Sequence, residues 1–119
     1  MKLNLKQAYL AMFNLLDGYY WSARDDILGG MLGFMSTDIF EEDMPADSAV
    51  WSTWENCVNK ITNNQSISSE EAFQSMLIFL RLYHEKFGFD LNWLFEELMN
   101  NSAHDEKWTN SVRNAIKEE

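Results

Sequence analysis

Residues 5–21 read LKQAYLAMFNLLDGYYW, and the spacing of their apolar side chains decides the fold class. An α-helix has about 3.6 residues per turn, so residues three or four positions apart share one face. The apolar positions that follow this spacing are Leu5, Ala8, Tyr9, Met12, Phe13, Leu16, Tyr19 and Tyr20. The stretch therefore predicts a long helix that buries a broad apolar face.

The same spacing recurs in five later segments, which are separated by helix start and stop signals. Side-chain oxygens of Ser, Thr, Asp and Asn accept hydrogen bonds from the free N–H groups of a helix start, and a Glu or Asp three residues later strengthens the signal. The predicted starts are Ser22 with Asp25, Asp47 or Ser48, Ser68 with Glu71, Asp90, and the neighbourhood of Asp105. Gly88 predicts the end of the helix that follows Ser68. Residues 36–46 break the pattern and are expected to form a loop.

The composition favours one helical domain. At 119 residues, 46% of them apolar, the chain matches a single core, and one Pro and five Gly leave few forced turns. No stretch shows a convincing alternation of apolar and polar residues, which a half-buried strand would need. We expect an all-α protein, with residues 1–119 forming one irregular bundle of about five or six helices.

Three glycines, Gly29, Gly30 and Gly33, lie within the predicted second helix. A phosphate-binding loop would need a strand before the glycines and a Lys-Ser or Lys-Thr pair after them, and neither is present. Close packing against a neighbouring helix is the better interpretation of this cluster.

The charge balance bears on location and partners. The N-terminus shows no uninterrupted apolar core of a signal peptide, and no run is long enough to span a bilayer, so we expect a cytoplasmic protein. A net charge of −10, with only nine Lys and Arg, argues against binding nucleic acid or an anionic membrane. A basic protein is the partner that this charge permits best.

Catalytic and cofactor-binding patterns are not found. The chain has one cysteine, Cys57, and two histidines, His84 and His104, without the spacing of a zinc or di-iron site. A Cys57–His84 nucleophile and base remains an alternative, but Cys57 lies on an apolar helix face, where a thiolate is disfavoured. We expect no enzyme activity, no cofactor and no metal, with Cys57 a small buried apolar residue.

The acidic residues are concentrated in one quarter of the chain. Between Asp17 and Asp47 eight acidic residues face one base, Arg24, so this segment holds −7 of the total charge. Three aromatic residues, 19–21, lie in the same segment. Successive helical residues are about 100° apart, so at least one of these rings is expected to be partly exposed beside the carboxylates.

Exposed aromatic residues surrounded by charge are typical of protein-binding hot spots. The candidate binding residues are Tyr20, Trp21, Asp25, Asp26, Asp38, Glu41, Glu42 and Asp43. The first two are the expected anchors, and the six carboxylates would attract a basic partner. The alternative interpretation is an ordinary solvated surface, with Trp21 packed beneath the acidic loop.

Three stretches of the chain, spanning about residues 7–88, carry a family resemblance. They are AYLAMFNLLDGYYWSARDDILGGMLGFMS (8–36), MPADSAVWSTWENCV (44–58) and EEAFQSMLIFLRLYHEKFG (70–88). Their acidity, helical pattern and Tyr-Trp-Asp-Asp cluster resemble small immunity proteins of bacterial polymorphic-toxin systems, including contact-dependent growth inhibition. The resemblance implies a cognate toxin domain as partner, often a basic nuclease, whose active site the immunity protein covers.

Other functions stay open at this point. A phosphate mimic that blocks a nucleic-acid enzyme would need carboxylates spread over a long surface, whereas here they are concentrated in one segment. A subunit of a larger assembly would leave apolar residues exposed in the monomer. An enzyme would be indicated by tightly bound metal or by a reactive Cys57. The sequence leaves the oligomeric state open.

Overall fold

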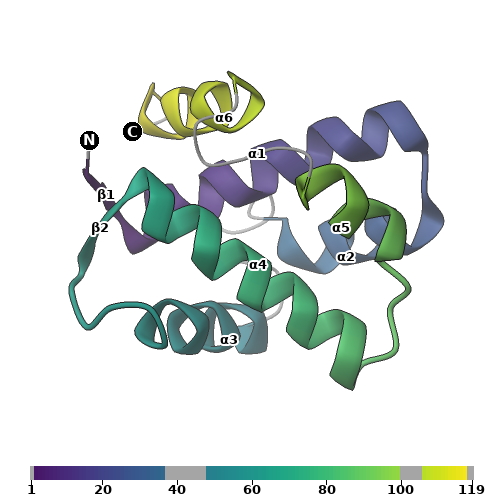
Figure 1. The fold of residues 1–119 in the computed structure, drawn as a ribbon, viewed down its shortest axis with the longest axis horizontal. Helices are drawn as coiled ribbons and strands as arrows, with labels where there is room; N and C mark the ends of the chain where they lie inside the picture. Colours follow the sequence, from purple (N-terminus) through teal and green to yellow (C-terminus); the bar gives the residue numbers. More distant parts are fainter. Residues whose placement is uncertain (1, 37–47, 100–105, 118–119) are drawn as a thin grey trace.

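Helix α1 (Leu5–Ala23) is the central element of the molecule, and four other helices contact it (Figure 1). The computed structural model describes residues 2–36, 48–99 and 106–117. The helices that follow α1 in this part of the chain are α2 (Asp26–Met35), α3 (Ser48–Asn59), α4 (Ser69–Lys86), α5 (Asn92–Met99) and α6 (Glu106–Lys117). The expected all-α bundle is confirmed. Helix α6 lies along α1 at one edge of the view, and α3 lies beside α4 at the opposite edge (Figure 1).

A short two-stranded sheet, which the sequence pattern did not predict, joins the starts of α1 and α4. Strand β1 (Lys2–Asn4) pairs antiparallel with β2 (Ser66–Ser68), with Leu3 opposite Ile67. Both of these side chains are fully buried. Three residues are too few to show an alternating pattern, so the strands escaped sequence analysis. The last residue of each strand is the N-cap of the following helix.

The structure matches the sequence signals at Ser68, Gly88 and Asp90, while the predicted starts at Asp47 and Asp105 lie outside the described residues. Ser68 and Glu71 form the predicted capping box: the Glu71 carboxylate accepts from the Ser68 amide at 2.8 Å, and the Ser68 hydroxyl accepts from the Glu71 amide at 3.0 Å. Asn4 and Gln7 form a second box at the start of α1. Gly88 has the left-handed φ of 74° expected just after a helix end. The Asp90 carboxylate accepts from the Asn92 amide at 3.2 Å, as expected for the start of α5.

The predicted capping box of Ser22 with Asp25 is wrong. Helix α1 continues through Ser22 to Ala23, and Arg24 takes a left-handed conformation with φ 56°. Its amide donates to the Tyr20 carbonyl at 2.6 Å, which closes α1. Asp25 is then itself the N-cap of α2, and its carboxylate accepts from the Leu28 amide at 2.9 Å. The junction between α1 and α2 is formed by Arg24 and Asp25, so Ser22 lies inside α1 and does not begin a helix.

Three buried aromatic side chains donate hydrogen bonds to main-chain carbonyls of segments that are distant in the sequence. The Tyr9 hydroxyl donates to the Met35 carbonyl at 2.7 Å, which attaches the end of α2 to α1. Burial raises the pKa of Tyr9 above its ordinary value, so the hydroxyl stays a donor. The indole of Trp54 donates to the Leu5 carbonyl at 3.1 Å, and that of Trp108 to the Ser69 carbonyl at 3.0 Å. These bonds place α3 and α6 against the first turns of α1 and α4.

Close packing at the predicted glycine cluster is confirmed at Gly29 and is wrong at the other two positions. A Cβ at Gly29 would lie 2.7 Å from Cε1 of Tyr20, so the ring uses the space that the missing side chain leaves. A Cβ at Gly30 or Gly33 would meet no atom of the described residues within 4 Å. Within that part of the chain, the close approach that needs a glycine is the one between Tyr20 of α1 and Gly29.

The capping box at Ser68 predicts a specific pH dependence of stability. The Ser68 amide, which donates to the carboxylate, holds the pKa of Glu71 below its ordinary value of 4.5. A carboxyl with a lower pKa in the folded state stabilises the fold fully above its unfolded pKa and loses that contribution as the pH falls through the folded pKa. We expect Glu71→Gln, which keeps an acceptor oxygen at this position, to remove this share of the acid sensitivity.

The test is urea unfolding of both proteins between pH 7 and pH 2. The difference in unfolding free energy between wild type and Glu71→Gln should stay constant at neutral pH and shift in favour of the variant below about pH 4.5. Parallel curves over the whole range would contradict a role for the Glu71 charge at this cap.

Candidate protein-binding surface

The end of α1 and the start of α2 form an exposed turn, residues 20–27, which we call the α1–α2 corner. It contains four of the eight predicted binding residues: Tyr20, Trp21, Asp25 and Asp26. The other four, Asp38, Glu41, Glu42 and Asp43, lie outside the described residues. The structure therefore brings the predicted aromatic anchors together with the first two carboxylates.

The three consecutive aromatic residues point in different directions, as predicted. Tyr19 is buried, Tyr20 is half-buried against Gly29, and Trp21 is 58% exposed. The expectation of at least one exposed ring is confirmed. With this exposure, Trp21 is not a core side chain.

The exposed indole of Trp21 is held in place by two neighbours. The guanidinium carbon of Arg24 lies 4.2 Å from the centre of the Trp21 ring system, a cation–π contact. The Tyr20 ring meets the indole edge-on, with 5.8 Å between ring centres. The left-handed conformation of Arg24 closes α1, so the residue that ends the helix also covers one side of the indole.

The two carboxylates of the corner have different surroundings. Asp25 is half-buried and its side chain is engaged as the cap of α2. Asp26 is exposed in the first turn of α2, where a negative charge interacts favourably with the helix dipole. Asp26 is therefore the carboxylate of this pair that is open to a partner, while Asp25 shapes the corner.

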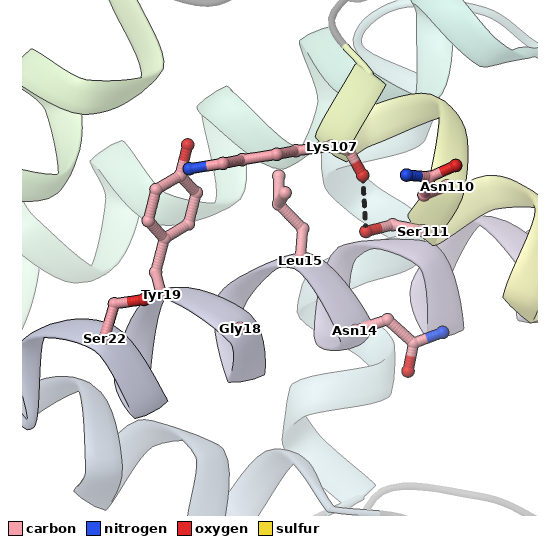
Figure 2. A pocket seen from close by; sticks show the side chains of 8 residues that line it. All are labelled: Asn14, Leu15, Gly18, Tyr19, Ser22, Lys107, Asn110 and Ser111. Carbon is pink, nitrogen blue, oxygen red and sulfur yellow. Dashed lines mark hydrogen bonds between the residues drawn. The ribbon is translucent and has the colours of Figure 1, made fainter.

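A groove between α1 and α6 is a concave feature that sequence analysis missed (Figure 2). It encloses about 280 Å³ and is lined by Asn14, Leu15, Gly18, Tyr19, Ser22, Lys107, Asn110 and Ser111. A signal was present in the sequence: Asn14, Gly18 and Ser22 follow one another at a spacing of four, so they form a strip of small and polar residues along one side of α1. That α6 supplies the opposite wall depends on tertiary packing and has no such signal.

Cys57 and His84, which sequence analysis considered as a catalytic pair, each lie in surroundings that serve the fold. Cys57 is buried, and desolvation raises the pKa of its thiol, as expected for an apolar residue of the core. His84 Nδ1 lies 2.8 Å from the Phe89 carbonyl oxygen and 3.2 Å from the Leu91 amide nitrogen, within the turn between α4 and α5. Among residues 2–36, 48–99 and 106–117, no three His, Cys, Asp or Glu side chains gather closely enough to hold a metal ion.

Comparison with known proteins identifies no relative from which a function could be inferred, so the argument for function starts from the side chains described above. The chain matches no protein-family model, no curated protein and no solved structure. Within the described part of the chain, none of the helices combines the length and the apolar character needed to cross a membrane.

The different surroundings of Asp25 and Asp26 predict different effects of the same substitution. Asp25→Ala removes an N-cap and should lower the free energy of unfolding by about 1 kcal/mol. Asp26→Ala loses only an exposed charge near a helix start, an effect of about 0.3–1 kcal/mol that salt screens. Urea unfolding at low and at 0.5 M salt measures both. An Asp26→Ala variant that is destabilised more than Asp25→Ala at either salt concentration would contradict this assignment.

Proposed function

We propose that this chain binds another protein through the α1–α2 corner, with Trp21 as the central anchor. The observation that carries the proposal is the 58% exposure of an indole that is already held by Arg24 and Tyr20. Trp, Tyr and Arg are the residues most enriched at interface hot spots, and here the three are adjacent.

The geometry of the indole favours tight binding. Ordering a free side chain on association costs about 0.5–1.5 kcal/mol, and contacts that already restrain the side chain reduce this cost. Trp21 lies on the last turn of a 19-residue helix, so its backbone is also fixed before binding. The exposed Ile27 at the start of α2 adds apolar area to the same corner.

The charge of the chain supports a basic partner. The whole chain carries −10, and residues 17–47 carry −7 of it. Such an excess speeds the approach of a positively charged protein and adds specificity. In this proposal Asp26 contributes from the corner itself, and Asp38, Glu41, Glu42 and Asp43 contribute from the acidic segment that follows α2.

The family resemblance makes the proposal more specific. Small immunity proteins of bacterial polymorphic-toxin systems bind the toxin domain of their own system, and we propose that this chain neutralises such a domain in the cytoplasm without being an enzyme itself. A nuclease toxin binds phosphates with Lys and Arg, so carboxylates of an immunity protein can occupy the same basic site. The indole would contribute desolvated contact area beside it.

The proposal predicts the behaviour of two matched variants. Trp21→Ala should weaken the complex with the protein encoded immediately upstream by about 2 kcal/mol or more, roughly a 30-fold rise in Kd. Phe87→Ala is the control, because Phe87 is also an aromatic residue with 58% exposure but lies at the end of α4. Purified complexes measured by surface plasmon resonance across salt give both Kd and association rate, and the rate should fall as salt rises.

Thermal unfolding of each variant shows whether the fold is intact. Equal Kd values for wild type and a folded Trp21→Ala protein would remove the corner as the binding surface. A larger loss for Phe87→Ala would move the surface to the end of α4. Absence of any complex would remove the proposed partner.

A further inference from the structure

The groove between α1 and α6 is continuous with the α1–α2 corner. Ser22 belongs to the corner and also lines the groove. Gly18, another lining residue, lies three positions before Trp21 and four before Ser22, so it is their neighbour on the surface of α1. Figure 2 shows Ser22 at one end of this row of residues and Asn14 at the other. A protein that docks on Trp21 therefore meets the groove one helical turn away.

The size of the groove suits one inserted side chain. Its volume of about 280 Å³ lies below the range of about 300–1,000 Å³ that is usual for small-molecule pockets. The space beside Gly18 is open, since a Cβ built there meets no atom of the described residues within 4 Å. At protein interfaces, the residues that contribute most to binding commonly fill small pockets of this kind on the other partner.

The walls of the groove favour an apolar occupant. Leu15 and Tyr19 are buried side chains that supply apolar surface, and Gly18 adds no side chain between them. The Ser111 hydroxyl donates to the Lys107 carbonyl at 2.9 Å, so this donor is already satisfied within α6. An apolar side chain that enters the groove is removed from water without leaving this hydroxyl unpaired.

The lining also indicates that the occupant is uncharged, although the proposed partner is basic. None of the eight described residues that line the groove carries a carboxylate, so an inserted Lys or Arg would lose hydration without gaining an ion pair there. The Lys107 ammonium lies 5.0 Å from the centre of the Tyr19 ring, and both side chains are engaged in further interactions within the protein. Lys107 therefore does not call for an acidic residue in the partner.

We propose that the groove receives one uncharged apolar side chain of the basic partner protein, next to the contact that this protein makes with Trp21. The acidic residues attract the basic surface of the partner, and the groove selects the residue that lies beside the indole. This inference rests on the function proposed above and adds a second anchor point to the same surface.

Filling the groove tests whether it is occupied. Gly18→Leu places a side chain in the open space, and Leu is a better helix former than Gly. Gly33→Leu is the matched control, because Gly33 is also an exposed helical glycine with open surroundings, but it lies in α2 and does not line the groove. With the protein encoded immediately upstream as the probe, surface plasmon resonance should give a Kd that is about tenfold or more higher for Gly18→Leu. Gly33→Leu should change Kd by less than about twofold.

A second pair of variants tests the charge of the occupant. Asn110 and Asn114 are both exposed on α6, and only Asn110 lines the groove. Asn110→Asp and Asn114→Asp add the same charge, so the long-range attraction of a basic partner is matched between them. An apolar occupant would desolvate the new carboxylate at the groove, so Asn110→Asp should bind about threefold or more weakly than Asn114→Asp.

The outcomes separate this inference from the proposed function. A Kd that rises for Trp21→Ala but is unchanged for folded Gly18→Leu would overturn the groove as a contact and leave the corner in place. Asn110→Asp that binds as tightly as Asn114→Asp, or more tightly, would overturn the uncharged occupant. Unchanged binding of both Trp21→Ala and Gly18→Leu, or the absence of a complex, would overturn both proposals. Thermal unfolding shows whether each variant is folded, and the two α6 variants decide the question if Gly18→Leu is not.

Discussion

The burial of α1 is the constraint on which the other features of this molecule depend. Eight side chains of this helix are buried, from Ala8 to Tyr19, and α2, α3, α4 and α6 each cover part of it. The buried residues of this helix end at Tyr19, and residues 21–23 of its last turn are exposed. There Trp21 becomes exposed, Arg24 reverses the chain, and Asp25 starts α2. The proposed binding corner is therefore a direct result of where the burial of α1 ends.

Hydrogen bonds from buried aromatic side chains give this packing a defined geometry. Apolar contact alone permits several helix arrangements, whereas a buried indole or phenol must reach a particular acceptor. Tyr9, Trp54 and Trp108 each reach a main-chain carbonyl in another element. Each bond contributes about 0.5–1.5 kcal/mol, and an unmatched donor in the core would cost about 1–3 kcal/mol. The bond made by Trp108 attaches α6 to the start of α4, while α6 packs mainly against α1.

Features set by local spacing were predictable, and features set by tertiary packing were not. The helices and the caps at Ser68, Gly88 and Asp90 depend on residues within one or two turns, so the sequence pattern identified them. Ser22 has the right spacing for a cap but lies inside α1, because the core extends the helix past it. The short sheet and the groove need segments more than sixty residues apart in the chain.

The binding surface itself was predicted in part. Three consecutive aromatic residues on a helix force one ring outward, and the structure identifies it as Trp21. Helical geometry could not show that Arg24 stacks on this indole, since that contact needs the left-handed turn that ends α1. Nor could it separate the roles of Asp25 and Asp26, which are adjacent in sequence but differ in their hydrogen bonding.

Fluorine NMR of protein that contains 5-fluorotryptophan tests the proposed role of Trp21 most directly. Trp54 and Trp108 are buried, Trp51 and Trp93 are half-buried, and Trp21 is exposed, so the five signals should differ in their shift between H₂O and D₂O. Trp21→Phe identifies the exposed one. With the upstream-encoded protein bound, this signal should move and lose its solvent isotope shift, while those of Trp54 and Trp108 stay in place. A complex in which the Trp21 signal keeps its full isotope shift would contradict the account.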